Sequence, residues 1–277
     1  MPELPEVEGF RAVVEDNVVG RRIDRARFLD DWMLKDSTPS TAARRMNRRR
    51  VSAVDRRGKM LALFTDPLPG KTDTPVLALH FGMDGHPVMA RPDRPILHSD
   101  RVVLDLDDGE QFRFRNTRRL GFVRVVTRNE FADMAWRLGP DPLEAPLSYL
   151  VDALAIREAP VKALLLDQSF LAGVGNIYAD EALHAAGIHP GRPGYDLSDD
   201  EAERLHKALR NILKRAVTSK RQTRSKVRFP LLSVRKHASR QLGASGSPKV
   251  GCPRCTRPLK HTKIGGRTTF FCASCQT

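Results

Sequence analysis

Apolar residues near the start of the chain recur at the spacing of one helix face. They are Val7, Phe10 and Val14. Pro5 suits a first helical turn, where a missing N–H does no harm, and Gly20 can end the helix. The sequence therefore predicts a short N-terminal helix.

From residue 48 to about residue 126 the pattern changes to short apolar runs separated by turn residues. Strands are predicted at 51–55, 60–65, 75–80, 101–106, 111–115 and 121–126. The first two flank Arg56-Arg57-Gly58-Lys59, and the Asp-Gly pair at 108–109 favours a tight turn. Such a set of strands is typical of an all-β sandwich.

From about residue 129 to 217 the period is helical. Ser198 and Glu201 form a capping box before one apolar stripe made of Ala202, Leu205, Leu209, Ile212 and Ala216. Gly187 is placed to cap the preceding helix, with Pro190 just beyond. Residues 218–250 are basic and lack periodicity, which predicts a loop or linker.

Charge narrows the class of partner. The 277-residue chain has a formal net charge of +14, and from Arg204 to the end it has no Asp or Glu. An uncompensated basic field points to a polyanion, and nucleic acid is the expected one. No apolar run approaches a membrane span, and the start resembles no signal or transit peptide. A cytoplasmic protein without membrane contact is expected.

All four cysteines lie in the last 26 residues, as Cys252-x-x-Cys255 and Cys272-x-x-Cys275. Two such pairs fit a structural zinc site, and a reducing cytosol favours metal thiolates. Two structural disulfides are the alternative interpretation. We expect one structural Zn²⁺ bound by these four residues.

Pro2 is the first candidate for chemistry. If Met1 is removed, the secondary amine of Pro2 becomes a nucleophile able to form an iminium ion with an aldehyde carbon. Glu3 follows directly and could act as general acid or base. The plain alternative is a processed chain end without a catalytic role.

Three further features carry weight together. Lys59 follows Gly58 at a hairpin tip, where a cation can project, although a solvated turn lysine would look the same. Met83, between glycines 82 and 85, fits a loop tip that wedges into a base stack, or else a core residue. The Gly173-Val-Gly175 turn before Asn176 fits a phosphate-binding helix start, or an ordinary cap.

Taken together, these motifs resemble the formamidopyrimidine-DNA glycosylase / endonuclease VIII family of base-excision repair enzymes. The matching segments, in family order, are Met1–Glu8, Arg57–Lys59, His80–Met83, Ala172–Glu181 with Ala186–Pro190, and the two cysteine pairs with Arg267–Cys272. The resemblance implies an α+β chain. Its parts are an N-terminal β-sandwich catalytic domain flanked by helices at 1–128, a helix–two-turns–helix domain at 129–235, and a linker with a zinc-finger hairpin at 236–277.

The resemblance also implies residue roles in a bifunctional DNA glycosylase and abasic-site lyase. Pro2 would attack C1′ of a flipped-out damaged nucleotide, Glu3 would move protons, and Lys59 would assist beside the flanking phosphates. Asn176 and Arg267 would clamp the phosphates on the lesion side, and Lys162 matches a family lysine near the DNA. The gap left by the flipped base would be filled by Met83, Arg118 and Leu120. The expected partner is double-stranded DNA with a damaged base or abasic site, bound by a monomer in a bacterial-type, nucleoid-associated setting.

Departures from the family pattern concern the substrate. The family's Asp-Pro-Arg-Arg-Phe-Gly is Asn116-Thr-Arg-Arg-Leu-Gly121 here, and no covering loop for 8-oxoguanine aligns after Val217. We therefore expect a lesion other than standard 8-oxoguanine. The alternatives are oxidised pyrimidines, alkylated bases or crosslinked nucleotides, or a non-catalytic damage-binding protein on the same scaffold.

Overall fold

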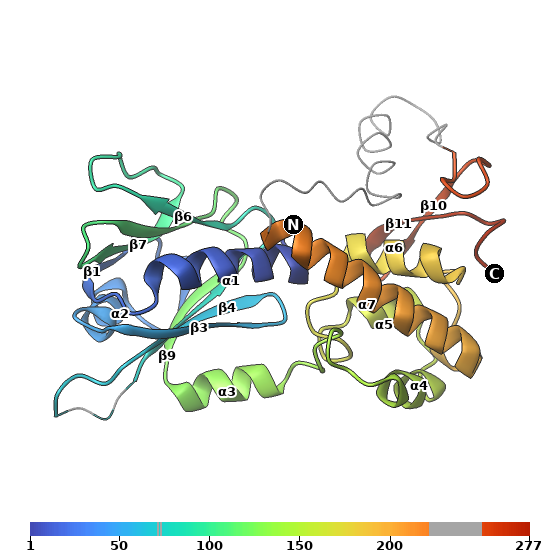
Figure 1. The fold of residues 1–277 in the computed structure, drawn as a ribbon, viewed down its shortest axis with the longest axis horizontal. Helices are drawn as coiled ribbons and strands as arrows, with labels where there is room; N and C mark the ends of the chain where they lie inside the picture. The colour runs from blue at the N-terminus through green and yellow to red at the C-terminus, as the bar shows by residue number, and fades with distance from the viewer. Residues whose placement is uncertain (71, 73, 222–250) are drawn as a thin grey trace. The chain divides into compact units, whose positions relative to one another are not determined.

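The computed structural model describes residues 1–70, 72, 74–221 and 251–277, and the chain divides into two units, Met1–Arg137 and Leu138–Thr277 (Figure 1). The boundary follows helix α3 (Arg128–Trp136), whereas the predicted boundary between residues 128 and 129 lies at the first residue of that helix. The reason is packing, because Phe131 of α3 meets Phe64 edge-on and joins an apolar cluster on the strands. The predicted 218–250 linker lies largely outside the described residues.

The first unit is a sandwich of two sheets. Its other elements are α1 (Leu4–Val18), β1 (Ile23–Phe28), β2 (Leu34–Lys35), α2 (Pro39–Met46), β3 (Val51–Arg57), β4 (Met60–Thr65), β5 (Val76–His80), β6 (His86–Ala90), β7 (Asp100–Leu106), β8 (Gln111–Arg115) and β9 (Phe122–Val126). Strand order is β1-β7-β8-β6 in one sheet and β2-β9-β5-β4-β3 in the other. All six predicted strands are present, and the sandwich is confirmed.

The core lies between the sheets, and helices close the edges. Both sheets supply fully buried side chains to one cluster, among them Leu63, Leu79, Leu104 and Phe112. Helix α1 contacts β3, β4 and β6, while α2 contacts β1 and β9. Each helix thus covers one open side of the sandwich, because α1 touches edge strands β3 and β6 and α2 touches edge strand β1.

The second unit is helical with a terminal hairpin. Its elements are α4 (Leu147–Ala155), α5 (Val161–Leu166), α6 (Asn176–Ala186), a 3₁₀ turn (Gly194–Asp196), α7 (Asp199–Arg221), β10 (Lys260–Ile264) and β11 (Arg267–Phe271). The predicted capping box is present, since Glu201 N–H donates to Ser198 Oγ and Ser198 N–H to Glu201 Oε2. Gly187 ends α6 with φ of +76°, also as predicted.

One part of the predicted α7 stripe needs correction. Leu213 is fully buried, whereas Ile212, which the stripe included, is half-buried. The helix continues the 3.6-residue period, so the inward direction falls on the residue after Ile212. Among the described helices, none has the length and apolarity needed to cross a bilayer.

Candidate functional site

The chain start places an acidic side chain at the beginning of a helix. Glu3 is fully buried and is the N-cap of α1, and its N–H donates to Glu6 Oε2 at 3.0 Å. Pro2, immediately before it, is half-buried. The carboxylate is therefore held in a fixed position directly after the candidate nucleophile.

Lys59 lies at the two-residue turn between β3 and β4, where Gly58 has φ of +58°. The turn is fastened to α1 by an ion pair, with Arg56 Nε 2.9 Å from Glu8 Oε2 and both side chains about nine-tenths buried. Arg56 also donates to the carbonyl of Gly58. The helix that begins beside Pro2 and Glu3 and the hairpin that carries Lys59 are thus joined by a shielded charge pair.

Strand register brings further candidate residues to the same end of the five-stranded sheet as Lys59. His80 pairs with Met60 on one side and with Phe122 on the other. The loop 81–85 therefore leaves β5 beside the Lys59 turn, and the loop 116–121 enters β9 next to it. Met83 and Leu120 are 39% and 41% exposed on these loops, and Arg118 is exposed as well.

His80 was quoted in a motif, but no role was predicted for it. Burial, and then the charge of Lys59, lower the pKa of His80 to about 4. Gly82 N–H donates to Nδ1 of His80 at 3.3 Å, so the neutral imidazole carries its hydrogen on Nε2. The folded protein thus holds a neutral imidazole beside the candidate lysine.

In the second unit, the Gly173–Gly175 turn leads into α6, whose first residue is Asn176. Gln168 organises the turn by accepting from Gly173 N–H and donating to Val174 C=O. Asn176 Nδ2 donates to the carbonyl of Thr268 at 3.1 Å, one residue after Arg267 in β11. Arg267 is exposed and follows the glycine turn 265–266. The structure therefore brings Asn176 and Arg267 to one place.

Lys162, predicted to lie near DNA, is completely buried. Its Nζ lies 2.6 Å from Asp180 Oδ1 and donates to Thr269 Oγ1 at 2.6 Å. The other Asp180 oxygen accepts from Phe270 N–H. The pair thus docks β11 onto the helices and fixes the segment beside Asn176 and Arg267. Asp180 was missed by sequence reasoning, although it lies inside the matched segment 172–181.

The ligand atoms of Cys252, Cys255, Cys272 and Cys275 lie within 4.8 Å of one another. Thiolates around tetrahedral zinc are about 3.8 Å apart, which the 3.5 Å and 4.0 Å sulfur separations bracket. Burial opposes ionisation of Cys272, but nearby N–H donors, first that of Ser274, and the other thiols lower its pKa to about 7. All four cysteines are free, so a zinc site rather than disulfides fits them.

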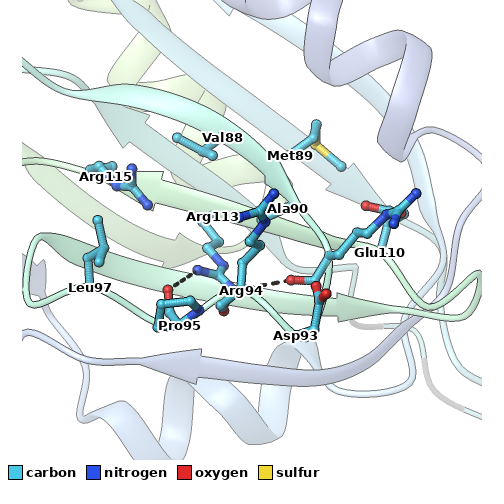
Figure 2. Close-up of a pocket in the computed structure, with 11 residues that line it drawn as sticks. Val88, Met89, Ala90, Asp93, Arg94, Pro95, Leu97, Glu110, Arg113 and Arg115 are labelled. Atoms are coloured by element: carbon cyan, nitrogen blue, oxygen red, sulfur yellow. Dashed lines mark hydrogen bonds between the residues drawn. The ribbon is translucent and has the colours of Figure 1, made fainter.

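The first unit contains a cavity of about 580 Å³, which lies between β6, β8 and the segment 91–97 (Figure 2). Arg113 lines it, but the guanidinium is already used. It donates to Gln111 and to the carbonyls of Arg94 and Pro95. Arg113 therefore fastens the 91–97 segment onto the sheet, and none of the predicted site residues lines this cavity.

Comparison with known proteins gives a consistent result along the chain. The N-terminal domain of formamidopyrimidine-DNA glycosylase matches residues 1–123, its H2TH domain matches 138–227, and the zinc finger found in FPG and IleRS matches 252–277. The formamidopyrimidine-DNA glycosylase of Chloroflexus aurantiacus is 35% identical, covering 100% of this chain and 98% of its own. That of Geobacillus kaustophilus is 36% identical, covering 100% of each.

Solved structures agree. Lactococcus lactis Fpg in complex with abasic-site DNA has a TM-score of 0.82 at 25% identity, covering 99% of each chain. A complex of the same enzyme with DNA containing N7-benzyl-Fapy-dG gives 0.82 at 26%. The chain belongs to the formamidopyrimidine-DNA glycosylase family. Membership of this family confirms the predicted fold. It also confirms the predicted enzyme class, a DNA glycosylase with abasic-site lyase activity.

Proposed function

We propose that the protein excises a damaged base from duplex DNA and then cleaves the strand through an iminium ion on Pro2. The observation that carries the proposal is the buried Glu3 carboxylate, fixed at the first turn of α1 directly after Pro2. Its position in a chain that aligns over its whole length with formamidopyrimidine-DNA glycosylases supports the same assignment.

The chemistry follows from the two groups. After loss of Met1, the Pro2 nitrogen forms a bond to C1′, and the glycosidic bonding electrons leave with the base, which takes up a proton. Glu3 protonates the ring oxygen as the C1′–O4′ bond opens, while the nitrogen loses its proton and the iminium forms. The iminium acidifies C2′, so loss of that proton expels the 3′-phosphate, and hydrolysis restores Pro2.

The remaining residues would hold the DNA. Lys59 would contact phosphates beside the reacting sugar, while Asn176 and Arg267 would clamp phosphate near the lesion. Met83, Arg118 and Leu120 would fill the gap left by the flipped nucleotide, which fits their exposure on two neighbouring loops. Lys162, buried against Asp180, would act by fixing the hairpin that carries Arg267.

We also infer one zinc ion at the four cysteines and a monomer that acts on nucleoid DNA in the cytoplasm. The lesion would differ from standard 8-oxoguanine, because the sequence after Val217 lacks the family's covering segment. Oxidised pyrimidines, alkylated bases and crosslinked nucleotides are the substrates to test. Each would use the same Pro2 chemistry.

Borohydride trapping tests the proposal, because it reduces an iminium to a stable covalent adduct. Protein with Met1 removed is expected to be trapped on abasic-site DNA through Pro2, as located by peptide mass spectrometry. Pro2→Gly and Glu3→Gln should each impair trapping or base release while duplex affinity stays near wild type. Glu15→Gln, which removes an exposed carboxylate from the same helix, is the control.

Two results would overturn the proposal. An active mature protein that retains Met1 would rule out the amine. Failure of correctly processed protein to be trapped on any abasic-site DNA would favour a damage-binding protein. A panel of duplexes, each with one defined lesion, then identifies the substrate by base release.

A further inference from the structure

Two loops of the sandwich unit, 81–85 and 116–121, are joined by a buried amide. Asn116 is fully buried, and its Nδ2 donates to the carbonyl of Phe81 at 3.1 Å and to that of Leu120 at 2.7 Å. Its Oδ1 has no hydrogen-bond partner among the described residues. A buried acceptor without a hydrogen-bond partner is unfavourable. The stabilising contribution of Asn116 is therefore the two hydrogen bonds that its Nδ2 donates.

Asp84, in the loop 81–85, makes the second connection to the loop 116–121. Its Oδ2 accepts from the backbone N–H groups of Thr117 and Arg118, each at 3.2 Å. A carboxylate beside a proposed phosphate-binding face weakens DNA binding by simple repulsion, so its presence calls for another reason. The family motif Asp-Pro-Arg-Arg-Phe-Gly has proline at the position of Thr117, and proline has no N–H to donate.

The backbones of the two loops are also in direct contact. A Cβ added at Gly82 would lie 2.0 Å from the Leu120 carbonyl oxygen, and one at Gly121 would lie 2.1 Å from that of His80. Arg119 has φ of +55°, a costly backbone angle for arginine, and its guanidinium donates twice to buried Asp30 at 2.8 and 2.9 Å. Such a conformation persists only where its surroundings hold it.

We propose that Asp84 and Asn116 are positioning residues that hold Met83, Arg118 and Leu120 as one preformed wedge. This rests on the proposed function, because the wedge would act by entering the base stack. Inserting apolar side chains into a stack costs free energy, and two independently mobile loops would add the cost of ordering them. A wedge ordered before DNA binds avoids that second cost.

The test separates wedge insertion from chemistry. A duplex carrying a tetrahydrofuran abasic analogue, with 2-aminopurine opposite it, reports wedge entry by fluorescence without reaction. Borohydride trapping on single-stranded abasic-site DNA reports the Pro2 chemistry where no stack must be opened. Asp84→Ala should lose most of the fluorescence change and about tenfold in duplex trapping rate, with single-strand trapping near wild type.

Charge provides an internal control with the opposite sign. Asp31→Ala removes an exposed carboxylate from the same unit, so it should bind duplex DNA at least as tightly as wild type and keep wedge entry. Only Asp84→Ala should lose wedge entry. Thr117→Pro, which keeps the Asp84 charge and removes one donor, should show a smaller loss of the same kind.

Three outcomes are distinguishable. If Asp84→Ala behaves like Asp31→Ala in the fluorescence and duplex assays, the positioning role is wrong. If duplex and single-strand trapping fall together, Asp84 supports the fold or the chemistry rather than the wedge, and the inference is again wrong. If wild type is never trapped, the proposed function fails, while the fluorescence comparison still decides the role of Asp84.

Discussion

The sandwich and the cysteine hairpin hold the residues that we propose contact DNA in two different ways. Behind the loops at 81–85 and 116–121 lies a large apolar cluster shared by two sheets. The hairpin that carries Arg267 has a small cluster of Leu259 with cysteines 252 and 272, and it is docked by the Lys162–Asp180 pair. Apolar burial can hold the first in place, whereas we expect the second to depend on a metal and on buried charge.

The largest expected effect comes from removing the metal. Zinc sites of this kind contribute roughly 10 kcal/mol of folding free energy, so chelation or Cys255→Ser should unfold the hairpin and strongly weaken duplex binding. Hydrogen exchange followed by mass spectrometry should show loss of protection in 267–271 with strand 76–80 unchanged. Equal loss in both segments, or unchanged affinity, would contradict the contrast between the two supports.

The next effect comes from the buried ion pair. Lys162→Met leaves the Asp180 carboxylate buried without its cation, which should cost about 3–5 kcal/mol in the free energy of unfolding measured with urea. Adding Asp180→Asn should recover part of that loss, since it removes the unpaired charge. Lys207→Met breaks the exposed pair with Glu203 and should leave the free energy of unfolding nearly unchanged, because solvent screens both charges. Similar losses for both pairs would mean that burial is not the cause.

The smallest effect concerns pH and the sandwich. The folded-state pKa of His80 is about 4, below its ordinary 6.5, so between these values the unfolded chain binds a proton that the folded chain does not. Its contribution to stability is complete above pH 6.5 and is lost as pH falls toward 4, by at most roughly 3 kcal/mol. Thermal unfolding of wild type and His80→Phe at several pH values checks this. Nuclear magnetic resonance titration of His80 near its ordinary pKa would contradict it.

Local signals explain why much of the fold was predictable. The β3–β4 and β7–β8 hairpins, the Ser198 capping box and the Gly187 cap each depend on a few consecutive residues. Strand β6 was not predicted because it contains Pro87, and proline argues against a strand. Pro87 is tolerated because β6 lies at a sheet edge. The elements between residues 23 and 46 were also not predicted. Strands β1 and β2 are short, and they are recognisable only once they pair with β7 and β9.

By itself the sequence determined the cysteine spacing, the adjacent Pro2 and Glu3, the turn of Lys59 and the family to which they belong. Only the tertiary structure decided that Lys162 is buried against Asp180, and that Asp84 holds the loop containing Arg118. These partners are far apart along the chain, and their pairing depends on how strands and helices pack. Short-range patterns report the conformation of a few neighbouring residues, whereas burial and charge pairing are set by the whole fold.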